Sequence, residues 1–146
     1  MTTTVERSVI IRANPDQINA VALDGARLPE WYEGIQASTP DSTYPLLGGA
    51  VNVTYKAAGI NFNLTMKSIE YVDGVSFGLE MDGMIKGRTR WELAQRGEGR
   101  TKLNCTFEYE MPGGSIGQAV NKMVVEKMNV ENLEKSLDRL KVLVEA

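Results

Sequence analysis

Few side chains in this 146-residue chain could perform chemistry, and histidine is absent. Histidine is the commonest general base and the commonest metal ligand, so its absence argues against most hydrolase and zinc-enzyme chemistry. Proton transfer would have to use carboxylates, tyrosines, lysine, arginine or the single thiol. The candidates are Tyr55 or Tyr71, whose hydroxyl would polarise a carbonyl, and Glu70 as the base. We expect no metal and no cofactor.

The position of Glu70 depends on the turn that follows it. A two-residue turn at Asp73-Gly74 places Ser68 and Glu70 on the apolar face of the sheet. A carboxylate there is desolvated, which raises its pKa towards neutrality and suits it to acid–base catalysis. In this alternative Glu70 is the catalytic candidate.

The other alternative is a three-residue loop, Val72-Asp73-Gly74. It turns Glu70 outwards and buries Ile69 and Tyr71, but requires a bulge between Met66 and Ile69. Because burial of a hydrophobic set usually decides the register of a strand, we favour this bulged form. Glu70 would then be solvated, which favours a binding protein over an enzyme.

The central strands agree on which of their faces is apolar. Side chains alternate across a strand, so a hairpin that sets the pairing also sorts residues onto two faces. Turns at Ala58-Gly59 and Arg96–Arg100 imply the pairs Tyr55–Phe62, Val53–Leu64, Leu93–Leu103, Trp91–Cys105 and Thr89–Phe107. The apolar face then holds Val51, Val53, Tyr55, Phe62, Leu64, Met66, Phe77, Leu79, Met81, Trp91, Leu93, Leu103, Cys105, Phe107 and Tyr109.

Such a sheet needs a cover, and the C-terminal segment supplies it. Ser115 and Gln118 form a capping-box pattern that opens a helix. Its apolar stripe contains Ile116, Val120, Met123, Val130, Leu133, Leu137, Leu140 and Val144, and widens at Val124, Val125 and Met128. The wider part predicts a helix covered on more sides there, as the roof of a cavity would be. Ordinary core packing is the alternative.

The N-terminal part predicts a strand at Val5–Arg12 and a helix capped by Asn14, with Pro15 at its first position. A short segment with Trp31 and Tyr32 follows. These two aromatics either form a lid or rim, or plug the end of the core.

Composition narrows the class of protein further. The net charge of −3, with no basic cluster, argues against nucleic acid as a partner. No stretch reaches the ~20 apolar residues of a membrane span, and no signal peptide precedes Val5, so we expect a cytoplasmic protein without stable membrane insertion. The single Cys105 is expected to fill the core. The length suits one domain, residues 1–146.

Several stretches resemble one known family. They are Val5–Pro15, Leu28–Tyr32, Gly87–Leu93 with its following turn, and Glu108–Gly114. Together they resemble the polyketide cyclase/dehydrase-like branch of the START-like (SRPBCC) superfamily, along nearly the whole chain. The resemblance implies an α+β helix-grip fold: a curved antiparallel sheet of six or seven strands around a long C-terminal helix, with two short helices after the first strand. It also implies a cavity for lipids, polyketides or quinones, in proteins of which only some are enzymes.

We therefore expect a binding protein for a hydrophobic or amphipathic small molecule, held between the sheet and the C-terminal helix. A cyclase or dehydratase acting on a polyketide-like substrate is the alternative, and a module that docks a partner through Ile35–Leu47 is a third. Monomer and homodimer both remain open. The expected ligand-binding residues are Trp31, Tyr32, Tyr55, Phe62, Leu64, Met66, Tyr71, Phe77, Leu79, Met81, Thr89, Trp91, Met123 and Met128.

Overall fold

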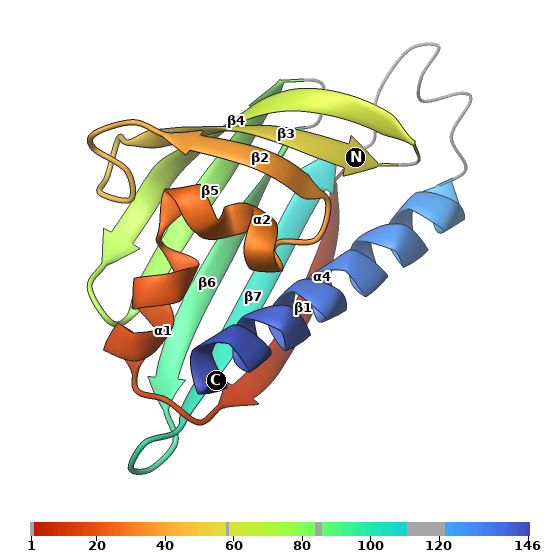
Figure 1. The fold of residues 1–146 in the computed structure, drawn as a ribbon. Coiled ribbons are helices and arrows are strands. Elements are labelled where there is room, and N and C mark those ends of the chain that lie inside the picture. The colour runs from red at the N-terminus through yellow and green to blue at the C-terminus, as the bar shows by residue number, and fades with distance from the viewer. Residues whose placement is uncertain (1, 58, 84–85, 111–121) are drawn as a thin grey trace.

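An antiparallel sheet in the order β1-β7-β6-β5-β4-β3-β2 dominates the molecule (Figure 1). It is seen in a computed structural model that describes residues 2–57, 59–83, 86–110 and 122–146, without the side chains of residues 57 and 122–124. The strands are β1 (Thr2–Ile11), β2 (Ile35–Pro40), β3 (Ala50–Ala57), β4 (Ile60–Val72), β5 (Ser76–Gly83), β6 (Gly87–Gln95) and β7 (Thr101–Glu110). The helices are α1 (Pro15–Ala22), a 3-10 turn η1 (Gly25–Arg27), α2 (Leu28–Trp31) and α4 (Lys122–Glu145).

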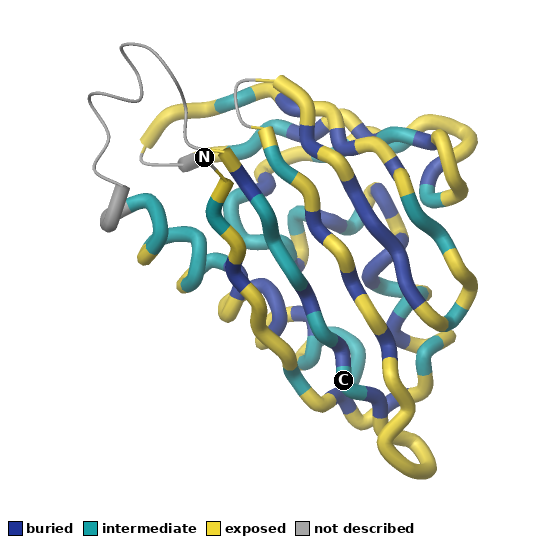
Figure 2. Tube along the Cα trace, turned by 180° about the vertical axis from the view of Figure 1, so that it is seen from behind, coloured by how far each residue is buried: buried dark blue, intermediate teal, exposed yellow. Residues whose placement is uncertain are grey.

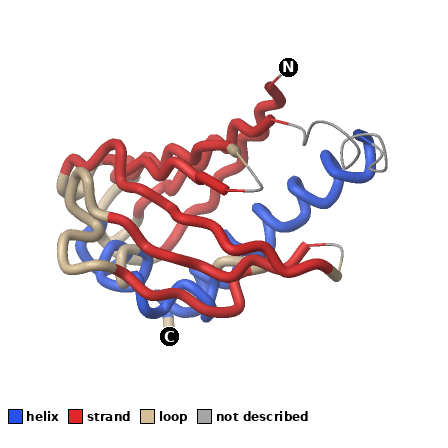
Figure 3. Tube along the Cα trace, turned by 90° about the horizontal axis from the view of Figure 1, so that it is seen from above, coloured by secondary structure: helices blue, strands red, loops and turns tan. Residues whose placement is uncertain are grey.

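The helices lie on one side of the sheet, and the sheet curls around them (Figures 1 and 3). Because β1 and β2 are the two edges, the connection through α1 and α2 must cross from one edge to the other. The long helix α4 packs on β1, α1 and α2. This is the α+β helix-grip arrangement expected from the sequence. None of the helices in the described part of the chain is long and apolar enough to span a membrane.

The predicted strand pairs are confirmed. Tyr55 lies opposite Phe62, and Trp91 lies opposite Cys105. The apolar residues of the predicted inner face are buried or half-buried, while the alternating residues that face outwards are mostly exposed. On the outer face Arg88 pairs with Glu108 across β6 and β7, with 3.3 Å between the charged atoms.

The register of β4 follows the bulged alternative, with two corrections. The three-residue loop is Asp73–Val75 and not Val72-Asp73-Gly74, because Val72 still pairs with Ser76. The bulge falls between Ser68 and Glu70, so Ile69 is the extra residue and is 38% exposed, not buried as expected. Glu70 then lies opposite Gly78 on the outer face, and Tyr71 lies opposite Phe77 on the inner face. The bulge sits later in the strand than the sequence led us to expect, so the small Ser68 takes the buried position instead of Ile69.

Side-chain hydrogen bonds hold the start of α1 and the end of α4. The Asn14 side chain accepts a hydrogen bond from the Gln17 backbone, and the Gln17 side chain accepts one from the Asn14 backbone, a complete capping box. At the other end of the chain, Glu145 accepts from the Arg12 backbone N–H at 2.8 Å and pairs with Lys141 at 2.7 Å. The expected start of the last helix at Ser115 lies outside the described residues, as does the side chain of Met123.

Candidate functional site

One half of the space between sheet and helix is filled. We call Trp31, Phe77, Trp91, Leu103, Leu137 and Leu140 the packed half; each is at most 2% exposed. The ring of Trp31 meets Trp91 edge-on at 5.6 Å between centroids, and Trp91 stacks on Phe77 at 5.6 Å. Trp31 is therefore a plug of the core and not a rim residue, which settles the alternative that its sequence left open. Tyr32 beside it is half-buried.

The other half is less tightly covered. We call Tyr55, Phe62, Phe107, Val125 and Met128 the open half; all five are only half-buried although they face inwards or lie on the apolar side of α4. Figure 2 shows the same difference along α4, with intermediate burial in its first described turns and buried residues farther along.

Strand β7 shows the contrast on a single face. Leu103 and Cys105 are 0% exposed, whereas Phe107, two residues further and on the same face, is half-buried. Since β7 lies between β1 and β6, the exposure of Phe107 does not come from a sheet edge. The next inward residue, Tyr109, is again only 3% exposed, so on this strand the incomplete cover of the inner face is confined to Phe107.

Polar groups on the inner side are few and mostly uncharged. The Trp91 indole donates to the Thr89 hydroxyl at 2.9 Å, inside the core. The Tyr109 hydroxyl and the Trp31 indole N–H are buried without a hydrogen-bond partner among the described residues. Buried donors without a partner destabilise a folded protein by about 1–3 kcal/mol each.

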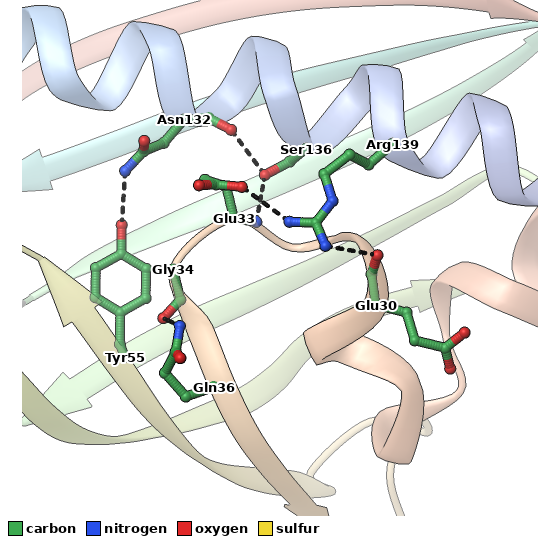
Figure 4. Close-up of polar contacts among 8 residues, drawn as sticks. All are labelled: Glu30, Glu33, Gly34, Gln36, Tyr55, Asn132, Ser136 and Arg139. Carbon is green, nitrogen blue, oxygen red and sulfur yellow. Dashed lines mark hydrogen bonds and ion pairs between the residues drawn. The ribbon is translucent and has the colours of Figure 1, made fainter.

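A set of polar contacts ties the middle of α4 to the segment after α2 (Figure 4). Ser136 accepts from the backbone N–H of Glu33 at 2.9 Å, and Arg139 pairs with the Glu33 carboxylate at 2.8 Å. Arg139 also donates to the backbone oxygen of Glu30 at 3.0 Å. One turn earlier, Asn132 donates from Nδ2 to the hydroxyl of Tyr55 at 3.3 Å. These contacts fix the helix against α2, the segment after it and β3, at the border of the two halves.

The tyrosine hydroxyls near this border stay protonated at neutral pH. Burial raises the pKa of Tyr32 well above its ordinary value. Burial also raises the pKa of Tyr55; the Asn132 hydrogen bond opposes this, and the nearby Glu33 carboxylate adds to it. Such hydroxyls act as hydrogen-bond donors rather than as phenolates.

The predicted site residues divide between the two halves. Trp31, Phe77 and Trp91 belong to the packed half, and Tyr55, Phe62 and Met128 to the open half. The remaining described ones line the inner face: Leu64, Met66, Leu79, Met81 and Thr89 are buried, and Tyr32 and Tyr71 are half-buried.

Sequence reasoning missed Asn132, Ser136, Glu33 and Arg139. A signal for two of them was present. Asn132 and Ser136 stand i, i+4 apart, each directly before a leucine of the apolar stripe. Polar residues at that spacing share one helix face. Their partners on the α2–β2 segment gave no such pattern.

Glu70 lies outside this site. Its carboxylate accepts from the Ser76 hydroxyl at 2.5 Å and pairs with Arg90 at 3.1 Å on the outer face. These two contacts lower its pKa, the opposite of the shift that a buried general base would show. Within the described ranges no three acidic or cysteine side chains converge as metal ligands would.

A groove of about 260 Å³ also lies on the outer face of β2, β3 and β4. Two of its polar side chains bond to each other, Thr65 to Asn52 at 2.9 Å. This pair is therefore already satisfied, unlike the inner donors described above.

Comparison with known proteins agrees with this architecture. The family described as polyketide cyclase/dehydrase and lipid transport matches residues 2–145. A search of curated protein sequences found no match.

Among solved structures, the aromatase/cyclase Zhui from Streptomyces sp. R1128 superposes with a TM-score of 0.85 at 13% identity, covering 99% of this chain and 94% of that one. A START superfamily protein from Mycobacterium smegmatis gives 0.80 at 18% identity, with 97% of each chain covered. A protein from Thermus thermophilus gives 0.83 at 19% identity, again with 97% of each covered. At these identities the structures show the fold alone. The family match, which spans nearly the whole chain, shows that this protein is a member of the polyketide cyclase/dehydrase and lipid transport family, with the START-like fold.

Proposed function

We infer that the protein binds a hydrophobic or amphipathic small molecule of the lipid, polyketide or quinone type, in the open half between the sheet and α4. The observation that carries this proposal is the half-buried Phe107 on a strand whose preceding inward residues are fully buried. Protein interiors are normally close-packed, so an inward aromatic left half-covered indicates room for another molecule.

The lining chemistry supports the same proposal. Aromatic rings and Met128 offer a surface that adapts to varied apolar shapes, and methionine is common where ligands vary. START-like folds bind hydrophobic ligands, which fits an inner face of this composition.

A cyclase or dehydratase reaction in the same site is the second candidate. The observation that favours it is the hydroxyl of Tyr55, which is protonated, half-buried and hydrogen-bonded to Asn132. An acid that polarises a carbonyl needs to be protonated and held in place in this way. Glu70 is not the base of such a reaction, because it faces the opposite side of the sheet. The nearby carboxylate of Glu33 would have to take that role, and it is engaged by Arg139.

Titration with Nile red, a neutral dye that fluoresces in apolar surroundings, tests the binding proposal. We expect micromolar binding by the folded wild type. Phe107→Asn should weaken binding at least tenfold, because it places an amide in the apolar lining. Thr106→Asn, the neighbouring outward position on β7, should leave binding within about twofold.

Equal effects of the two substitutions, or no binding by the wild type, would contradict the proposal. Native mass spectrometry of protein purified from its own host is an independent test, because it detects a retained molecule directly. A retained hydrophobic molecule is the expected result.

A further inference from the structure

Tyr55 joins the apolar lining of the open half to a polar group on α4. Its ring lies on the inner face between Ile35 on β2 and Phe62 on β4. Its hydroxyl oxygen accepts the Nδ2 hydrogen bond of Asn132 at 3.3 Å (Figure 4). A phenol whose oxygen accepts a hydrogen bond still has its own proton to donate. No described residue accepts that proton by hydrogen bond, so Tyr55 is an available donor facing the open half.

The ring of Tyr55 is held where it stands. Gly34 has φ +98°, and a Cβ added there would lie only 2.5 Å from Cε2 of Tyr55. Glycine thus allows the backbone to run against the edge of the ring. That backbone is fixed in turn by the hydrogen bond from the Glu33 N–H to Ser136. A donor held in this way loses little freedom when a ligand binds, which strengthens the interaction.

The electrostatic surroundings disfavour an anion at this hydroxyl. The carboxylate of Glu33 is close enough to raise the pKa of Tyr55, in addition to the larger effect of burial. The guanidinium of Arg139 offsets part of this charge, but it donates to the Glu33 carboxylate and the Glu30 backbone oxygen and not to a ligand. A ligand carboxylate near Tyr55 would lie close to the Glu33 carboxylate, whose partner Arg139 is already engaged.

We propose that Tyr55, oriented by Asn132, is the polar anchor of the ligand site, and that it selects a neutral oxygen over a carboxylate. The anchored group is the carbonyl or hydroxyl of an otherwise apolar molecule, with the apolar part against Phe62 and Phe107. Glu33 is the residue that excludes anions. This inference rests on the proposed function and adds the chemical class of the ligand to it.

Three probes of nearly the same shape test the inference. 2-Acetylnaphthalene carries a neutral ketone, 2-naphthoate carries a carboxylate, and 2-ethylnaphthalene carries no oxygen. Their affinities are measured by displacement of Nile red at pH 7 from the full chain. One hydrogen bond corresponds to about a tenfold difference in dissociation constant.

The Tyr55→Phe variant should weaken ketone binding about tenfold and change 2-ethylnaphthalene binding by less than about twofold. Its matched control is Tyr71→Phe, which removes the hydroxyl of another inward, half-buried tyrosine on the sheet. The control should leave the ketone-to-hydrocarbon ratio unchanged. Retained hydrocarbon binding shows that the Tyr55→Phe protein is folded.

The Glu33→Gln variant should strengthen 2-naphthoate binding about tenfold, since it removes the negative charge and frees Arg139. Glu30→Gln is its control, because Glu30 pairs with Arg27 on the surface at 2.8 Å and its side chain does not contact Arg139. It should leave 2-naphthoate binding unchanged.

The outcomes separate the two proposals. If all three probes bind but the ratio does not depend on Tyr55, or depends equally on Tyr71, the anchor is wrong while the binding function stands. If 2-naphthoate binds the wild type as tightly as the ketone, the selection for neutral oxygen is wrong. If no probe binds the wild type, the binding function and the anchor both fail.

Discussion

The packed half and the open half share strands and a helix, yet their side chains differ in burial. Strand β7 and helix α4 run through both. Where α1 and α2 add a further layer, the inward side chains of the sheet and helix are sealed, down to 0% exposure at Leu140. Beyond that layer, among the residues that the structure describes, Tyr55, Phe62 and Phe107 on the same face are only half-buried. The layer of α1 and α2 therefore seals one part of the grip, and the part beyond this layer is the one we propose to hold a ligand.

The largest expected effect is on stability, and it should differ between a substitution in the packed half and one in the open half. Trp91→Ala should lower the free energy of unfolding by about 3–5 kcal/mol, because it removes a large, fully packed side chain. Phe107→Ala should lower it by about 2 kcal/mol or less, since part of that ring already contacts solvent. Urea unfolding of both variants measures the difference. Equal losses would indicate that the open half is an ordinary core.

Gly34→Ala tests the border between the halves. Its positive φ strains any other residue by about 1–3 kcal/mol, and the new methyl group would collide with the Tyr55 ring. We expect a destabilised protein with weakened binding of 2-acetylnaphthalene. Gly97→Ala is a matched control, since Gly97 also has a positive φ, +99°, but no atom within 4 Å of an added Cβ. A loss of stability without any effect on ketone binding in Gly34→Ala would separate this border from the ligand site.

A smaller effect should appear at the end of α4, far from the open half. Arg12 and Lys141 lower the pKa of Glu145 from 4.5 to about 2, with the Arg12 backbone N–H as the main cause. A carboxylate whose pKa is lower in the folded protein than in the unfolded chain stabilises the fold at any pH above its unfolded pKa. That contribution is lost as the pH falls through its folded pKa. Glu145→Gln should therefore lower the melting temperature at pH 7, and the difference from wild type should shrink between pH 4.5 and pH 2. A difference that is constant with pH would show that the charge of Glu145 does not matter.

The smallest effect is expected at Glu70. Its ion pair with Arg90 is partly exposed, so Glu70→Gln should change stability by about 1 kcal/mol or less. Because Glu70 faces outwards, Nile red binding should not change. A variant that is clearly more stable, or that no longer binds the dye, would indicate that Glu70 is part of the candidate site.

The sequence predicted the sheet well because turns and alternation act locally. The hairpin at Ala58-Gly59 and the loop at Arg96–Arg100 set the pairing of four strands, and the inner face followed from that pairing. The bulge was harder, since sliding it by one residue changes which of Ser68 and Ile69 is buried without altering the pattern elsewhere.

The candidate site was only partly predictable. The aromatic lining follows from alternation, but the contacts of Asn132, Glu33 and Arg139 join segments about a hundred residues apart in sequence, and local pattern carries no information on such pairs. Whether Trp31 was a rim or a plug likewise depended on its packing against Trp91.

If the proposed function holds, a ligand occupies the open half and leaves the packed half unchanged. Methyl NMR of protein labelled at methionine, leucine and valine, titrated with 2-acetylnaphthalene, tests it most directly. We predict that the signals of Met128 and Val125 shift with saturation, while those of Leu103, Leu137 and Leu140 stay in place. Shifts centred on the three leucines, or spread evenly over both groups, would contradict the account.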